Sequence, residues 1–510
     1  MASTTATTLG ALLSQRVALH GLSPAVRWDQ DDAHWGLLSY QALAQRVASL
    51  VAAVPVARGE RVAWLGFNHP AQIALLFALA QRGALLVPLN HRLAPAGWAA
   101  VVADCSPTVL LHDQAFAEPA QSLAAATGMQ AMAIDNVPLN VQATTPDASQ
   151  PDVAVLLAYT AGHTDVPKGA VHTQASLLAQ LAVAARVQGL GDADTVLCAL
   201  PLFDSAGPCA QALPALGAGA VVLLHSRFDP ADLLIAIERD RPTLTRLAPA
   251  QLQALTQHPR WAATHLRSLR AIWAGWGPLP AAPVQACAAR GLPVCNVYGT
   301  AETGGLAIAL GPEHALSHLG SCGWPVPGVD VKLVDAQDED VVRGRAGEIC
   351  VRGPGVAQRW WPDVAALDAD GFLHSGDLGL CDALEFEKNK ILRAYGVFQT
   401  KHPQEPGCYF SDKPPVVETP SVNAEKRSKK QPEGAEMPSD IESEEESIEV
   451  DVDEAPSQWS AAPLASALHA QNTDHGRNQV AAHKRPGLRQ QAARHPEQRH
   501  RRRPHRDGQQ

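Results

Sequence analysis

The sequence predicts an α/β fold, with a large domain in which helices cover a sheet, a small β-rich subdomain after it and a largely disordered tail. Up to about residue 300, short apolar runs alternate with helical patterns, as in parallel strands joined by helices. Between about residues 320 and 380, short runs are separated by Pro and Gly, which favours small antiparallel strands. Beyond residue 384 the composition becomes charged and poor in apolar residues.

The expected elements of the first part follow from apolar periodicity. Residues 37–54 predict a helix, because Ser39 is a good N-cap and apolar residues recur on one face. Residues 61–65, 71–82 and 84–88 then predict a strand, a helix and a second strand. The same alternation of strand-like and helix-like segments predicts a helix at 176–187 and strands at 109–112, 129–134, 153–158, 196–200, 220–224, 243–247, 271–274 and 294–298.

The second part is expected to contain strands at 329–335 and 348–352, and the stretch 371–379 closes it. Residues 403–438 are rich in Pro, Glu, Lys and Ser, residues 439–454 are acidic, and residues 484–506 are rich in Arg, His and Gln. Such segments bury too little apolar surface to offset their conformational entropy. The predicted division is therefore 1–320 for the α/β core, 321–383 for the β-rich subdomain and 384–510 for an unrelated, mostly disordered tail.

Composition excludes several classes of function. The 510 residues carry 51 acidic and 41 basic side chains, a net charge of −10, which argues against a nucleic-acid partner. The nine cysteines show no paired short spacing, so neither a zinc site nor a disulfide framework is expected. The N-terminus lacks a signal-peptide pattern, and the longest apolar stretches are broken by polar residues or too short to span a bilayer. A cytoplasmic protein is expected.

Residues 159–169, YTAGHTDVPKG, form a polar and glycine-bearing loop directly after a predicted strand. Glycine lets the backbone approach an anion, threonine hydroxyls donate hydrogen bonds, and lysine supplies a positive charge. The loop therefore predicts a phosphate site. A polar surface loop is an equal alternative as long as the loop is considered alone.

Two further segments follow in order, 298–302 (YGTAE) and 374–377 (HSGD). With supporting matches at 87–90, 201–203, 320–328 and 347–349, they resemble the adenylate-forming superfamily of acyl-CoA synthetases, peptide-synthetase adenylation domains and luciferases. The resemblance covers about residues 10–380 and implies the large multi-sheet N-terminal domain of those enzymes, with its small β-rich subdomain. It also implies a small carboxylic acid as substrate, which attacks the α-phosphate of ATP to give an acyl-adenylate that a thiol, usually coenzyme A, then accepts.

The resemblance assigns roles in holding the triphosphate. Both the acid and ATP are anionic, so magnesium, lysine and amide donors must offset their repulsion. Lys168 and Glu302 are the expected catalytic residues, and Glu302 would hold magnesium together with Thr160. The expected phosphate cradle consists of Thr160, Gly162, Thr164 and Lys168.

The nucleoside contacts are likewise implied by the resemblance. Tyr298, with Gly299 and Thr300 beside it, would pack against the adenine, and Asp377 would accept hydrogen bonds from the ribose hydroxyls. Each of these residues alone is more often structural. Their order along the chain favours the nucleotide-binding interpretation.

The acid pocket is expected beyond residues 201–203, the Pro-Leu-Phe segment, and next to the adenine site. Trp273 and Trp276 flank Ala274 and Gly275 and would narrow a cavity, which favours a short or flat acid. That either tryptophan belongs to the core is an equal alternative. The pocket candidates are Phe203, Asp204, Gly207, Trp273, Gly275, Trp276 and Asn296.

The chain also departs from the family pattern. Ala161, His163 and Asp165 replace the usual hydroxyl residues and glycine of the phosphate loop, and Ala301 replaces a threonine. An aspartate about 5 Å from a phosphate would cost on the order of 3 kcal/mol. The usual Gly-Arg hinge and lysine-bearing C-terminal domain have no counterpart after Leu384. The sequence therefore predicts impaired ligation, with a catalytically inactive nucleotide- or acyl-binding protein as the alternative.

Overall fold

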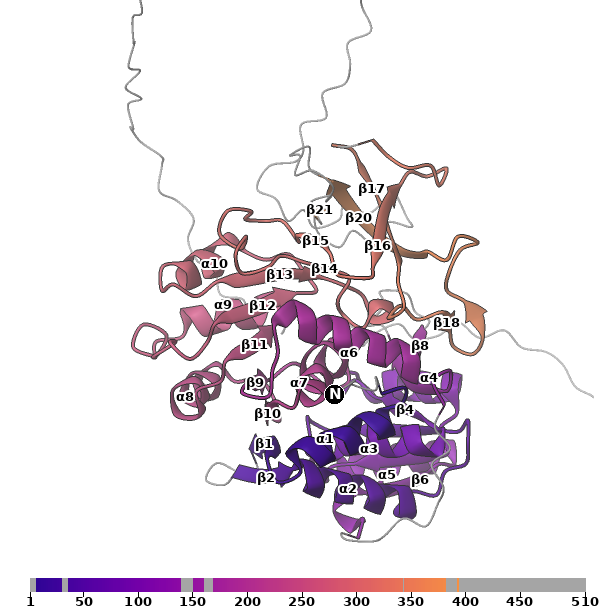
Figure 1. Cartoon of the computed structure of the whole chain (residues 1–510). Helices are drawn as coiled ribbons and strands as arrows, with labels where there is room; N and C mark the ends of the chain where they lie inside the picture. Colours follow the sequence, from indigo (N-terminus) through magenta and orange to yellow (C-terminus); the bar gives the residue numbers. More distant parts are fainter. Residues whose placement is uncertain are drawn as a thin grey trace, which may run out of the picture. The chain divides into compact units, whose positions relative to one another are not determined.

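The computed structural model describes residues 6–29, 35–138, 150–159, 168–342, 344–381 and 392–393. All of them belong to the first of two compact units into which the chain divides, Met1–Glu418. Their strands form three sheets, with helices packed beside the two larger ones (Figure 1). The predicted α/β fold class is confirmed. The predicted disorder of the tail concerns residues outside the described part and stays a prediction.

The first sheet has nine strands in the order β15-β14-β13-β12-β11-β9-β10-β1-β2. Its centre, from β13 to β1, is parallel, and antiparallel strands close both edges. The bounds are β1 Pro24–Asp29, β2 Trp35–Ser39, β9 Thr195–Cys198, β10 Val221–Leu224, β11 Leu244–Leu247, β12 Ala271–Gly275, β13 Val294–Tyr298, β14 Ile308–Ala309 and β15 Trp324–Pro325.

The second sheet has eight strands in the order β19-β18-β8-β7-β4-β3-β5-β6. The run from β7 to β6 is parallel, whereas β8 returns antiparallel to β7. The bounds are β3 Arg61–Leu65, β4 Leu85–Pro88, β5 Val109–His112, β6 Gln130–Ala133, β7 Ala154–Tyr159, β8 Gly169–Thr173, β18 Arg359–Trp360 and β19 Val364–Ala365.

The third sheet is small and antiparallel, with the order β16-β17-β20-β21. Its short strands between turns match the pattern expected of the β-rich part. The bounds are β16 Asp330–Val334, β17 Ala346–Arg352, β20 Leu373–Cys381 and β21 Leu392–Arg393.

The α-helices of the described part are mostly short connections between strands. Four brief helical turns accompany them: η1 Gln114–Phe116, η2 Ile134–Asn136, η3 Pro208–Ala212 and η4 Ala301–Thr303. The α-helices are α1 Leu9–His20, α2 Tyr40–Ala53, α3 Pro70–Arg82, α4 Pro95–Cys105, α5 Ala117–Thr127, α6 Gln174–Gln188, α7 Leu213–Ala218, α8 Pro230–Asp240, α9 Pro249–Gln257 and α10 Ala281–Ala288.

Helix α3 explains how the two large sheets share a core. Every residue from Pro70 to Ala80 is buried, which is typical of a helix enclosed by other elements on all sides. The same cluster of buried side chains contains Leu86 and Leu156 of the second sheet and Val222 and Trp273 of the first. Burial of this apolar surface holds the two sheets together.

Helix α2 begins as the sequence predicts. The Ser39 side chain accepts a hydrogen bond from the backbone N–H of Ala42 at 3.1 Å, so it caps the helix. We expect Ser39→Ala to lower the free energy of unfolding by about 1 kcal/mol, since the N–H loses its acceptor. Ser39→Asp is the matched control and should retain nearly all of it. Equal denaturation midpoints for the alanine variant and the wild type would contradict this role.

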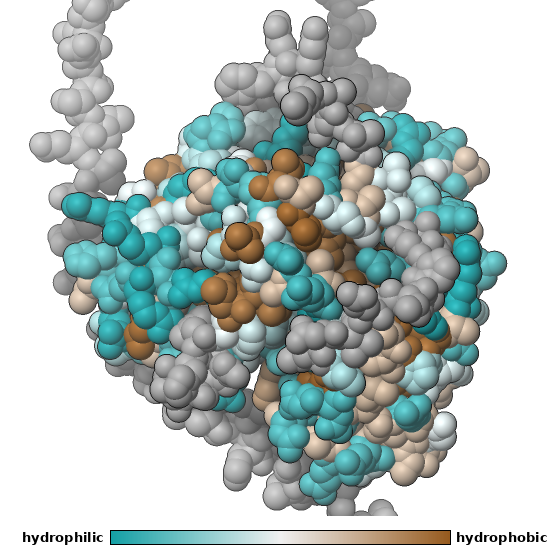
Figure 2. Space-filling model, turned by 60° about the horizontal axis from the view of Figure 1, so that its bottom comes forward, coloured by the Kyte–Doolittle hydropathy of each residue, from teal (hydrophilic) through white to brown (hydrophobic). Residues whose placement is uncertain are grey.

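Apolar side chains also reach the surface. On the face drawn in Figure 2, hydrophobic residues gather near the middle and hydrophilic residues surround them. Leu22 is the most exposed large apolar residue of the described part, at 87%. No helix in the described ranges is long and apolar enough to cross a membrane.

Candidate active site

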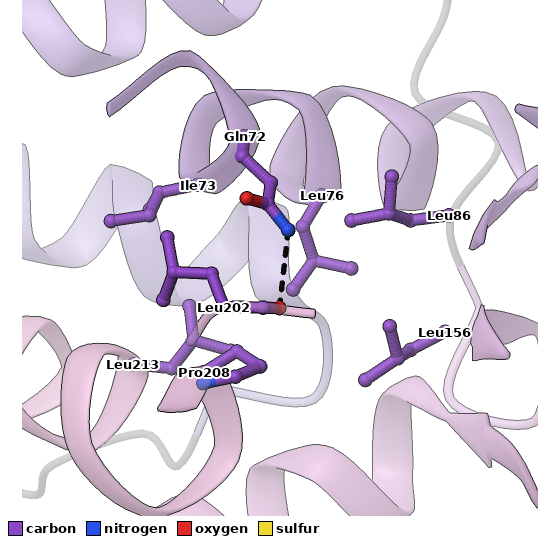
Figure 3. Close-up of a pocket in the computed structure, with 8 residues that line it drawn as sticks. All are labelled: Gln72, Ile73, Leu76, Leu86, Leu156, Leu202, Pro208 and Leu213. Carbon is purple, nitrogen blue, oxygen red and sulfur yellow. Dashed lines mark hydrogen bonds between the residues drawn. The ribbon is translucent and has the colours of Figure 1, made fainter. Parts of the chain in front are cut away.

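The buried side-chain amides of Asn68 and Gln72 hold the Pro-Leu-Phe segment in place through hydrogen bonds to its backbone. Asn68 donates to the carbonyl oxygens of Leu200 and His225 and accepts from the N–H of Leu202 at 2.7 Å. Gln72 on α3 donates to the Leu202 carbonyl at 3.1 Å (Figure 3). The apolar side chains around this contact enclose only about 10 Å³, the lower limit for one water molecule. This junction therefore positions the segment and is too small to hold a substrate.

Tyr298 and Asp377 meet although 79 residues separate them. Tyr298 ends β13, and its hydroxyl donates to Oδ2 of Asp377 on β20 at 2.8 Å. Both residues are buried, at 7% and 9% exposure, and burial raises the pKa of each side chain. The hydrogen bond holds an aromatic ring and a carboxylate beside each other, as the two nucleoside contacts of the predicted site require.

Glu302 lies in the short turn η4, directly after β13. Its backbone carbonyl accepts from Ala357 N–H at 2.7 Å, which ties the turn to the chain that leads to β18. The carboxylate is 9% exposed, and its Oε2 is buried without a hydrogen-bond partner among the described residues. Burial raises the pKa of this carboxyl, and the nearby Thr300 hydroxyl and the positive charge of Lys168 offset that effect only in part.

The phosphate loop connects β7 to β8, and Tyr159 pairs with Gly169 at its two ends. Thr160, Gly162 and Thr164 lie outside the described residues, so their predicted roles stay predictions. Lys168 is described, with its Nζ 6.0 Å from the centre of the Trp360 ring.

His172 joins the phosphate loop's return strand to the turn that carries Glu302. The imidazole on β8 is fully buried, and its Nε2 donates to the carbonyl oxygen of Ala301 at 2.9 Å. Its Nδ1 has no partner in the described part, and burial lowers the pKa of His172 to about 4. The ring is therefore neutral near pH 7 and acts as a fixed donor.

Two predicted site residues next to Glu302 have structural contacts. The N–H of Thr300 donates to the Thr303 hydroxyl at 2.8 Å, which closes the turn. A Cβ on Gly299 would lie 2.3 Å from the backbone nitrogen of Leu306, so only glycine fits there. The Thr300 hydroxyl is buried without a partner among the described residues.

The pocket candidates divide into two groups. Phe203 packs its ring edge-on against His91 at 5.0 Å and lies under the guanidinium of Arg92 at 5.6 Å. Asp204 is solvent-exposed and accepts from the N–H of Ala206 at 3.1 Å. These two side chains lie beside the loop after β4.

The second group consists of Gly207 directly before η3, Gly275 at the end of β12 and Asn296 within β13. A Cβ on Gly207 would lie 2.2 Å from the Pro201 carbonyl oxygen, and one on Gly275 would lie 2.1 Å from that of Val297. Both glycines therefore permit close backbone approach. Asn296 donates to the Ser321 carbonyl at 2.9 Å and lines a cavity of about 240 Å³.

The two tryptophans have different environments. Trp273 is 1% exposed and belongs to the large core. Trp276 is partly exposed, and its Nε1 donates to the Gly305 carbonyl at 3.1 Å. Its φ of +63° is rare for a bulky residue. Gly305 also approaches Ala206, so Trp276 lies where the Pro-Leu-Phe segment and the loop after Glu302 converge.

His172 and Arg246 belong to no motif of the sequence, but the structure places both beside the candidate site residues. Arg246 is fully buried on β11 and stacks on the Trp276 ring at 5.0 Å. A charged residue inside the predicted strand 243–247 was the available signal. His172 carries no local signal, because its partner Ala301 is 129 residues away.

Such a site, on two α/β sheets followed by a small antiparallel one, is the arrangement expected of adenylate-forming enzymes. The AMP-binding enzyme family model matches residues 13–361, and the chain belongs to this family. The predicted resemblance is confirmed.

Curated relatives are coenzyme A ligases. An indoleacetate–CoA ligase of Aromatoleum aromaticum is 36% identical over 393 residues, which cover 72% of this chain and 76% of the relative. A feruloyl-CoA synthase of an Amycolatopsis species is 37% identical over 357 residues, covering 68% and 71%.

Solved structures agree with the fold. The inhibitor-bound N-terminal domain of FACL13 from Mycobacterium tuberculosis superposes with a TM-score of 0.70 at 25% identity, covering 77% of this chain and all of that domain. O-succinylbenzoate coenzyme A synthetase from Bacillus subtilis, in complex with ATP and magnesium, gives a TM-score of 0.67 at 26% identity, covering 76% and 79%. The described part thus has the N-terminal domain fold of adenylate-forming enzymes.

Proposed function

We propose that this protein activates a small carboxylic acid with ATP and transfers the acyl group to coenzyme A. The observation that carries the proposal is the buried carboxylate of Glu302, whose Oε2 has no partner among the described residues. A buried acceptor left unpaired costs about 1–3 kcal/mol, and a bound cation would remove that cost. Family membership and the two coenzyme A ligases among the relatives support the same activity.

The described residues fit a nucleotide with magnesium. Glu302 would hold the cation, together with Thr160, which lies outside the described residues. Tyr298 and Asp377 would receive adenine and ribose, and the Tyr298 hydroxyl keeps the Asp377 carboxylate oriented. Bound magnesium would neutralise charge on the phosphates. Lys168, at the start of β8, would add the second positive charge, and His172 would keep the Ala301 backbone in place.

The acid is proposed to be short or flat. Trp276 stands where the Pro-Leu-Phe segment and the loop after Glu302 converge, and it shortens any pocket that opens there. Relatives named for indoleacetate and ferulate are consistent with a planar acid. Phe203, Asp204, Gly207, Gly275 and Asn296 remain proposed pocket residues.

A nucleotide-binding protein without turnover is the second candidate. Asp165 in the phosphate loop and Ala301 in the Glu302 turn favour it, because one adds negative charge and the other removes a hydroxyl donor.

Pyrophosphate exchange with the full-length chain, Mg-ATP and a panel of aryl and short aliphatic acids tests both candidates. We expect acid-dependent exchange and, with coenzyme A, acyl-CoA product. ATP binding by calorimetry without exchange for any acid would favour the second candidate. The absence of both would contradict nucleotide binding altogether.

A further inference from the structure

Arg246 is an isolated cation in an apolar part of the first sheet. The strand register aligns it with Cys198 on β9 and Trp273 on β12, and Trp273 with Cys295 on β13. All four of these residues are buried, and Arg246 has no exposed surface. Placing a guanidinium there costs several kcal/mol unless an anion or a full set of acceptors compensates.

The described residues supply only part of that compensation. Nη1 donates to the Ala210 carbonyl of η3 at 2.6 Å, but this oxygen also accepts from Gln188 Nε2 at 3.1 Å. Nε and Nη2 of Arg246 are buried and have no hydrogen-bond partner in the described ranges. No carboxylate of these ranges forms a salt bridge with Arg246 either. Burial lowers the pKa of Arg246 to about 9, so the group is still charged at pH 7.

The guanidinium that carries the two unpaired donors lies next to Trp276, one of the proposed pocket residues. The Trp276 ring covers the guanidinium at 5.0 Å, and the same indole donates to Gly305, next to the turn of Glu302. η3 follows the Pro-Leu-Phe segment and supplies the Ala210 contact. Arg246 is also one residue from the carboxyl end of β11, the end at which parallel sheets bind their ligands.

We propose that Nε and Nη2 of Arg246 bind a second carboxylate at the far end of the acid, so that the substrates are dicarboxylic acids. Arginine presents two parallel donors that match the two oxygens of a carboxylate. Trp276 would stack over the pair and exclude water from it. This inference rests on the proposed function, because it assumes that the reacting carboxylate lies near Glu302.

Calorimetric binding to the full-length chain tests the inference without requiring turnover. The probes are two matched pairs: terephthalic acid with its monomethyl ester, and adipic acid with its monomethyl ester. We expect at least one diacid to bind about a hundredfold tighter than its ester, as for a buried charge pair. Arg246→Met should remove that preference without weakening the ester, and Arg246→Lys should keep part of it.

Equal affinity for diacid and ester in both pairs, or no binding of any diacid, would overturn the proposal. So would an equal loss of both ligands in Arg246→Met. If Arg246→Met does not fold, the wild-type preference and the Arg246→Lys variant decide the matter. Diacid binding without pyrophosphate exchange would leave the inference intact and reject the ligase activity instead.

Discussion

Replacing Glu302 by glutamine is expected to lower activity and raise stability at the same time. The variant loses the negative charge proposed to hold magnesium, so Mg-dependent ATP binding and pyrophosphate exchange should fall by at least about a hundredfold. Burial raises the pKa of this carboxyl, so the ionised form destabilises the folded state above the unfolded-state pKa. An uncharged amide removes that cost, and the free energy of unfolding at pH 7 should rise by about 1–3 kcal/mol.

Glu313→Gln is the matched control, because this side chain is 67% exposed and undergoes the same chemical change. It should alter neither nucleotide affinity nor stability by more than about 0.5 kcal/mol. Calorimetry with Mg-ATP and urea denaturation measure the two effects separately. A Glu302→Gln protein that binds Mg-ATP like the wild type would remove the basis for the magnesium role.

Acid is expected to destabilise the protein through His172. Its folded-state pKa, about 4, lies below the ordinary value of 6.5, so below pH 6.5 the unfolded chain binds a proton that the folded chain does not. Stability contributed by this residue is therefore complete above pH 6.5 and falls as the pH decreases towards 4. At 1.36 kcal/mol per pKa unit, the loss amounts to about 3 kcal/mol.

His172→Gln isolates this effect, since the amide nitrogen can still donate to the Ala301 carbonyl and does not titrate. Urea denaturation between pH 4 and 7 should show wild-type stability falling relative to the variant by about 3 kcal/mol. His265→Gln, on an exposed histidine, serves as control. Parallel pH profiles for wild type and His172→Gln would show that the imidazole is not held neutral.

Sequence periodicity predicted most strands and their order along the chain. Residues 61–65 and 109–112, for example, are β3 and β5. It could not divide the strands between two sheets, because a buried apolar run has the same composition in either sheet. That division depends on which side chains α3 contacts, and those contacts are long-range.

The proposed nucleotide site depends on both local and tertiary information. Tyr298, Glu302 and Asp377 stand in recognisable local motifs, so their likeness to the family could be read without a structure. That the Tyr298 hydroxyl reaches Asp377, and that Oε2 of Glu302 is left without a partner in the described part, required the packed strands.

The sequence by itself determined the family, the fold class and the order of the site motifs, because these depend on local residue types and spacing. Tertiary structure alone decided that Trp273 is buried in the core while Trp276 faces the converging site segments, and that Arg246 lies beneath it. Strand pairing and the cover of η3 bring these residues together from separate strands. The role of a single cation within a strand can be inferred only once its neighbours across the sheet are known.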